Sequence, residues 1–250
     1  MLELTGDYPA AAASQQRALA LCLDLGDLEG QAEALNCLAV VQQETGDHPA
    51  AAASQRQALT LWRDLGNLGG EAEALNCLGV VQQETEDYPA AAASHQRALA
   101  QFGDLGNRLG QAETLNRLGE LATRTADTPQ ARKHHAQALA IARDLGAPLE
   151  EARALEGLGQ SHLQDARPCQ AAVHLPQALA IYQRIGAPAA HRVQQTLQNH
   201  KLASTTPQRQ PTAPQQPSPT ARIRPPPPHE AARQAAVRTH AHRRVCARTA

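Results

Sequence analysis

Apolar residues recur at helical spacing along most of the chain. One stripe predicts a helix over about 28–45, with apolar side chains three or four positions apart at Leu35, Leu38, Ala39 and Val41. Gly46 and Asp47 then suit a left-handed helix end and the N-cap of a following helix, and Pro49 fits its first turn. In this second helix we expect an inward face made of Ala51, Ala58, Leu59, Leu61 and Leu65.

This helix pair is written repeatedly, with a period of 40 residues. Asp7–Gly46 and Asp47–Glu86 are identical at 29 of 40 aligned positions. Looser copies occupy Asp87–Ala126 and Asp127–Ala166, and a half copy occupies Arg167–Pro188. A period of this size predicts an all-α solenoid, in which each unit buries its apolar face against its neighbours.

The two ends of the repeat region differ. Residues 1–5 take the place of Val41–Thr45, so the chain is expected to begin inside a repeat, as a fragment of a longer protein or a truncated reading frame. At the other end, 189–203 is polar with Val193, Leu197 and Leu202 spaced apart, which predicts a closing helix. We therefore expect a repeat array over 1–203.

Residues 204–250 carry no repeat and hold nine of the 17 prolines, which predicts a disordered tail. Three interpretations stay open for it: a tail without a specific role, translation out of frame, or a binding tail for nucleic acid or an SH3-type domain. The tail contains eight Arg and one acid, which leaves the array with 15 basic and 23 acidic residues. Because the array is acidic, we expect it not to bind nucleic acid directly.

The composition bears on the cellular compartment of the protein and on the kinds of site that it can form. No charged-then-apolar leader and no apolar run long enough for a membrane span are present, so we expect no membrane association. Cys37 and Cys77 fall at the same repeat position and are expected to be small buried residues in a reducing, cytoplasmic setting. No metal site is expected, because the cysteine and histidine spacings fit no zinc site. No cofactor and no small-molecule substrate are expected either.

The repeats resemble tetratricopeptide repeats. A Leu-Gly pair recurs at 78–79, 118–119 and 158–159, with Leu38-Ala39 in the first full unit. Small residues stand where paired helices would cross, at Ala51, Ala91, Ala131 and Ala171, and again at Ala18, Ala58, Ala98, Ala138 and Ala178. The unit has 40 residues instead of 34 and lacks the family's usual Trp, Tyr and closing Pro.

The longer unit is similar to kinesin-light-chain-type repeats and looks like the C-terminal arrays of actinobacterial multidomain regulators. The resemblance implies a right-handed α-solenoid of helix pairs whose first helices line a concave face. It also implies a non-catalytic scaffold that binds a protein or peptide partner. No GxxxxGK[ST] motif for a nucleotide-binding switch domain occurs in this chain.

Three asparagines recur on the predicted concave face, at Asn36, Asn76 and Asn116, and Glu156 replaces the fourth. In similar repeats this residue hydrogen-bonds the backbone of an extended peptide, and an amide suits that task because it both donates and accepts. The alternative is an Asn that satisfies a neighbouring helix or faces water. The remaining residues of the predicted peptide site are charged: Glu73, Glu84, Glu113, Arg124 and Arg153.

Other candidates for chemistry are weaker. His134 and His135 are neighbours on one helix and point in different directions, so we expect surface histidines and no shared metal. No nucleophile stands with a base, so no enzyme is predicted. We therefore expect a protein-interaction scaffold, the sensing array of a bacterial regulator. The alternatives are a regulatory fragment of a larger NTPase-type transcriptional regulator and a non-functional truncated gene product.

Overall fold

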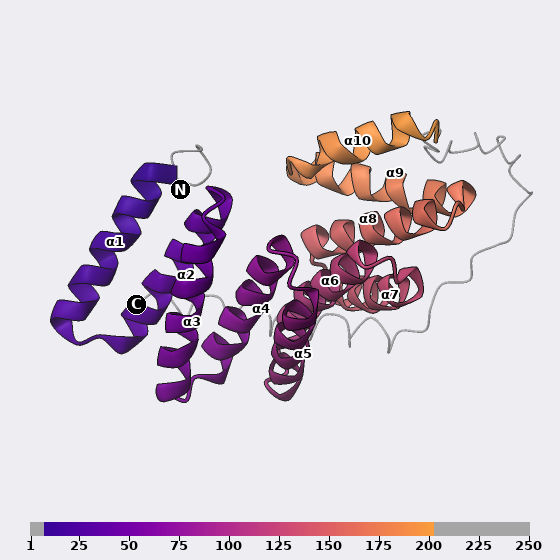
Figure 1. Cartoon of the computed structure of the whole chain (residues 1–250). Coiled ribbons are helices and arrows are strands. Elements are labelled where there is room, and N and C mark those ends of the chain that lie inside the picture. The colour runs from indigo at the N-terminus through magenta and orange to yellow at the C-terminus, as the bar shows by residue number, and fades with distance from the viewer. Residues whose placement is uncertain (1–7, 203–250) are drawn as a thin grey trace, which may run out of the picture. The chain divides into compact units, whose positions relative to one another are not determined.

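The structure, a computed structural model, describes residues 8–202, and within this range it contains ten α-helices and no strand (Figure 1). In chain order the helices are α1 Tyr8–Leu25, α2 Leu28–Glu44, α3 His48–Asp64, α4 Leu68–Glu84, α5 Tyr88–Asp104, α6 Arg108–Arg124, α7 Thr128–Leu145, α8 Pro148–Gln164, α9 Pro168–Ile185 and α10 Ala189–Asn199. The expectations for residues 1–5 and for the tail at 204–250 lie outside the described residues.

The helix ends follow the predicted chemistry. Asp47 accepts a hydrogen bond from the backbone N–H of Ala50, and Asn67 caps α4 in the same way through Gly70. Pro49 lies in the first turn of α3, where its missing N–H leaves no helical hydrogen bond unmade. Gly46 has a φ of 80°, in the left-handed region, as expected for the end of α2.

Each first helix packs against the second helix that follows it, which gives the pairs α2–α3, α4–α5, α6–α7 and α8–α9. Each second helix also packs against the next first helix, and α10 packs on α9. The predicted crossing alanines of α3, α5, α7 and α9 are fully buried: Ala51, Ala91, Ala131 and Ala171. Small side chains let the helix axes approach closely at these points. The predicted all-α solenoid of tetratricopeptide-like helix pairs is confirmed.

Two residues expected in the core lie elsewhere. Leu65 is 41% exposed, because it forms the C-cap of α3 at the corner and no longer lies on the inward stripe. Cys37 is exposed on α2, because the buried stripe of that helix runs through Leu35, Leu38 and Ala39 on either side of it. Leu35, Leu38, Ala39 and Val41 themselves are buried as predicted.

Candidate protein-binding groove

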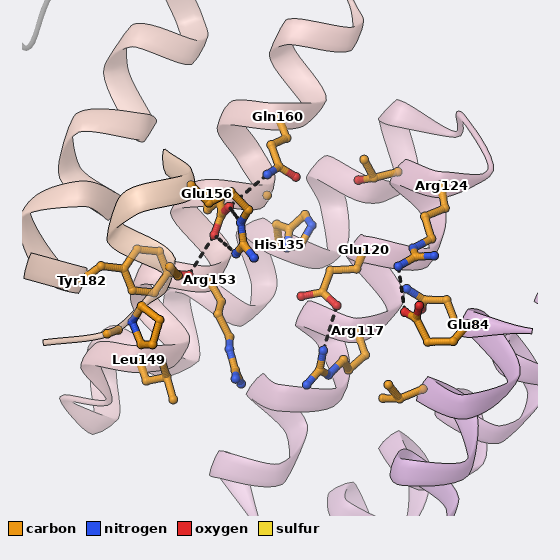
Figure 2. Close-up of a pocket in the computed structure, with 18 residues that line it drawn as sticks. Glu84, Arg117, Glu120, Arg124, His135, Leu149, Arg153, Glu156, Gln160 and Tyr182 are labelled. Atoms are coloured by element: carbon orange, nitrogen blue, oxygen red, sulfur yellow. Dashed lines mark hydrogen bonds and ion pairs between the residues drawn. The ribbon is translucent and has the colours of Figure 1, made fainter. Parts of the chain in front are cut away.

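The first helices of successive units share a groove of about 550 Å³, shown in Figure 2. It is lined by α4, α6 and α8, and it is bounded at one end by Ala187, Pro188 and Ala189 before and at the start of α10. Its charged lining residues are Glu84, Arg117, Glu120, Arg124, Arg153, Glu156 and Arg192. Three residues of the predicted peptide site, Glu84, Arg124 and Arg153, therefore lie together in one groove.

The arginines of the groove are each engaged by a carboxylate. Arg124 Nη2 donates to Glu84 Oε1 at 2.8 Å, which joins α6 to α4. Arg117 donates to Glu120 at 3.0 Å within α6 (Figure 2). A guanidinium carries five N–H donors, so one such bond leaves further donors for a ligand. The groove thus presents arginine N–H groups beside half-exposed carboxylates.

The side chain of Asn116 is buried between helices and does not lie exposed on the concave face, where it was predicted. Its side chain is 1% exposed, and its Nδ2 donates to the backbone oxygen of Glu150 at 3.1 Å and to Glu150 Oε2 at 2.9 Å. Its Oδ1 lies 3.2 Å from His135 Nδ1. The amide is therefore used to join α6, α7 and α8, and in this structure it has no exposed group to offer a peptide.

The other members of the predicted site do not line the groove. Asn76 is half-buried, and its Oδ1 lies 2.9 Å from His95 Nδ1 of the paired helix α5. Asn36 is half-buried, and its buried Oδ1 has no hydrogen-bond partner among residues 8–202. Glu73 is exposed on α4 and Glu113 half-buried on α6. Burial, and then the charge of Glu150, raise the pKa of Glu113. Peptide binding by these residues stays a prediction.

Glu156, which replaces the fourth asparagine, forms a cluster that sequence reasoning missed. It is 5% exposed, and Arg192 of α10 binds it with two hydrogen bonds of 2.9 Å each. Tyr182 of α9 donates to it at 3.0 Å and Gln160 of α8 also at 3.0 Å (Figure 2). Burial and the adjacent carboxylate raise the pKa of the Tyr182 hydroxyl, which stays protonated as a donor. The cluster fixes α10 at the end of the groove.

The expectation of surface histidines at 134 and 135 is wrong for His135, which is 1% exposed between α6 and α8. Two glycines leave the space that the His135 ring fills. A Cβ at Gly119 would lie 2.5 Å from the ring, and a Cβ at Gly157 would lie 2.2 Å from it. His95 is equally enclosed next to Gly79. Burial lowers the pKa of both His95 and His135 to about 4, so both rings are neutral near pH 7.

In the part of the chain from 8 to 202, no three His, Cys, Asp or Glu side chains are grouped so that they could hold a metal ion. Over the same residues, no helix has the length and apolar character needed to cross a bilayer. Burial raises the pKa of Cys77 to about 11, so this half-buried thiol is protonated and a poor nucleophile.

Comparison with known proteins agrees with this architecture. Sequence profiles of the family described as tetratricopeptide repeat match residues 70–144 and residues 31–65. These two segments of the chain match tetratricopeptide repeats. No curated protein matches the sequence.

Solved structures of tetratricopeptide type show the same fold at low sequence identity. BtubC (BKLC) from P. vanneervenii aligns with a TM-score of 0.60 at 19% identity, over 90% of this chain and 83% of that one. MamA aligns with a TM-score of 0.51 at 19% identity, over 74% of this chain and 94% of that one. These likenesses show that the chain has the fold of a solenoid of helix pairs. Tetratricopeptide repeats in general form scaffolds for protein–protein interaction.

Proposed function

We propose that this tetratricopeptide array binds a segment of a partner protein in the groove lined by α4, α6, α8 and the start of α10. The observation that carries the proposal is the groove itself, because it is a hollow of about 550 Å³ on the shared face of three consecutive first helices. A concave surface that spans several units suits an extended segment better than a compact small molecule.

The side chains of the groove support binding over catalysis. The Thr123 hydroxyl donates to the backbone oxygen of Gly119 at 2.9 Å, and His135 is held by Asn116. Neither group therefore stands as a nucleophile beside an available base. The Tyr182 hydroxyl is likewise engaged, because it donates to Glu156 at 3.0 Å. The remaining polar lining is made of Arg, Glu and Gln side chains, which recognise peptide groups and charged side chains by hydrogen bonding.

The two ends of the groove differ in what they offer a ligand. At the α8–α10 end, the carboxylates of Glu150 and Glu156 are almost fully buried and already accept hydrogen bonds from the protein. Arg153, which donates to Glu150 at 2.7 Å, keeps its remaining N–H groups on the groove side as donors. We therefore expect this end to take a carboxylate or carbonyl oxygen of the partner. The α4–α6 end, where Glu84 and Glu120 are half-exposed, accepts cationic or neutral groups.

The regulatory part of the proposal rests on the resemblance of the repeats to arrays of bacterial regulators. In that setting the groove senses a partner and passes the signal to another domain of the regulator. We place the array in a reducing cytoplasm, since Cys22, Cys77 and Cys169 are free thiols.

Site-specific photo-crosslinking tests the groove as a binding surface. A photoreactive residue at Gln160, half-buried in the groove on α8, is compared with the same residue at Gln137, exposed on α7 outside it. In an extract of the source organism, one protein should be cross-linked from position 160 and not from position 137. Equal capture from both positions, or capture from 137 alone, would place binding on the outer helices.

A further inference from the structure

Helix α1 has nearly the same sequence as α3 but a different environment. In α3, Ser54 is buried and donates to Gln42 of α2 at 2.8 Å, whereas Ser14 at the same repeat position is exposed on α1. Of the described part of α1, only Ala11 is buried, whereas α3 buries six residues. Among residues 8–202, no helix therefore covers the face of α1 that corresponds to the α2-covered face of α3.

This open face is apolar at its centre. Leu21 is 63% exposed, whereas its equivalents Leu61, Ile141 and Ile181 are all half-buried. Helix α10 differs, because it buries its apolar Val193 and Leu197 and exposes polar residues such as Gln194 and Gln198. A polar outer face is what a closing helix requires, and on α1 the exposed Leu21 interrupts such a face.

This face carries one positive and one negative residue, so it is complementary in charge to a second copy of the same face. Arg17, Leu21 and Asp24 follow one another at spacings of four and three, so they lie on one side of the helix. Arg17 and Asp24 are both exposed, and neither forms an ion pair with any residue between 8 and 202. On α5 the residue equivalent to Arg17 is Arg97, and it pairs across a helix interface with Glu71 of α4 at 3.3 Å.

We propose that α1 is a dimer interface, in which it packs antiparallel against α1 of a second copy about a twofold axis at Leu21. In this arrangement Arg17 of one copy and Asp24 of the other differ in height along the helix axis by one residue, a rise of about 1.5 Å. Twofold symmetry forms this ion pair twice, on either side of the two leucines. The leucines lose their exposed surface to each other, which supplies the apolar part of the contact.

Charge reversal in the full chain tests this geometry by sedimentation equilibrium. The wild-type chain should show a concentration-dependent monomer–dimer equilibrium. Arg17→Glu alone or Asp24→Arg alone turns both ion pairs into repulsions and should raise the dimer dissociation constant roughly tenfold or more. The double variant restores opposite charges and should return the constant to near the wild-type value. Asp104→Arg, at the equivalent exposed position of α5, is the matched control and should leave the constant unchanged.

Each contrary result overturns the proposal. A wild-type chain that is monomeric up to high concentration removes the dimer. Single reversals without effect, or a double variant that stays as weak as the single ones, remove the Arg17–Asp24 pairing. Leu21→Asp gives an independent check, because a dimer that survives this change does not have its axis at Leu21. Helical circular dichroism of each variant establishes that the chain is folded, and Asp24→Asn serves as a milder change if a reversal disturbs it.

Discussion

The unit α4–α5 and the unit α8–α9 use the same repeat position in different ways. In the first, the half-buried Asn76 makes one side-chain hydrogen bond among residues 8–202, with His95 of the paired helix α5. In the second, Glu156 is buried and accepts hydrogen bonds from α8, α9 and α10. The position serves in both to join a first helix to what packs on it. A neutral amide suffices inside the array, whereas the short α10, which buries only Val193 and Leu197, is held in addition by a charge.

A second pair of positions shows how a unit diverges without disturbing its packing. A Cβ on Gly70 would lie 2.3 Å from the ring of Trp62, so the aromatic residue requires the glycine. In the fourth unit, Ala142 stands where Trp62 does, and Glu150 stands where Gly70 does. The large and the small residue have exchanged places, and Glu150 is buried beside Asn116. Each unit is therefore adapted to its own neighbour.

The largest expected effect comes from breaking the charge cluster of the divergent unit. Arg192→Ala leaves the Glu156 carboxylate buried without its cation, and we expect a loss of roughly 3 kcal/mol in the free energy of unfolding. Urea denaturation measures this loss. The control is Arg184→Ala, which removes an exposed arginine at the end of α9 that has no ion pair within residues 8–202. A loss at Arg192 no greater than at Arg184 would contradict the anchoring role of the cluster.

A methyl group added beside His135 is expected to have the next largest effect. Gly157→Ala places a Cβ 2.2 Å from a ring enclosed by two helices, so either the ring or α8 must shift, at a cost of about 2–3 kcal/mol. Gly69→Ala is the control, since its Cβ meets nothing closer than Asn67 Oδ1 at 3.4 Å. Thermal melts of the two variants should differ by several degrees. Equal melting temperatures would show that the enclosure of His135 is loose.

The stability lost on truncating Asn116 and Asn76 to alanine compares the two positions directly. Asn116→Ala removes the partner of both His135 and Glu150 inside the core, and we expect a loss of about 1–3 kcal/mol. Asn76→Ala removes one contact at a half-buried site, so its cost should be below about 1 kcal/mol. Both values are measured by chemical denaturation. If Asn76 costs as much as Asn116, the two positions are equivalent and the comparison fails.

The neutral histidines predict a gradual dependence of stability on pH. The pKa of His95 and His135 is lowered from 6.5 to about 4 on folding, so the unfolded chain binds more protons between these values. The buried rings therefore do not reduce the free energy of unfolding above pH 6.5. As the pH falls from 6.5 toward 4, the free energy of unfolding decreases by roughly 1.4 kcal/mol per pH unit for each ring. His95→Leu, which places there the residue found at Leu175, should reduce this slope. An unchanged slope would contradict the burial of His95; exposed His191→Leu is the control.

Much of the fold could be predicted from the sequence because the features that determine it are local and repeated. Asp47, Gly46 and Ala51 act through short-range rules of capping and close packing, and the 40-residue period places them in every unit. The burial of Leu38 and Val41 likewise follows from spacing alone.

The site was harder to predict because it depends on contacts between units. Asn116 is enclosed by Glu150 and His135, which both lie in the next copy of the repeat, Asp127–Ala166, so neither contact is visible in a single repeat. One signal was available: Asn76 and Asn116 each have a histidine 19 positions later, whereas Glu156 has Leu175 there. This joint change indicates a contact between the asparagine and the histidine.

The central claim is that partners bind in the groove and not on the outer helices. It is tested most directly by the affinity of the partner cross-linked from position 160, measured by isothermal titration against two matched variants. Arg124 and Arg143 are both half-exposed and each has one carboxylate, Glu84 at 2.8 Å and Glu151 at 2.9 Å, but only Arg124 lines the groove. Arg124→Ala should weaken binding about fivefold or more and Arg143→Ala less than about twofold, with equal stability. Full affinity in Arg124→Ala together with a loss in Arg143→Ala would contradict the account.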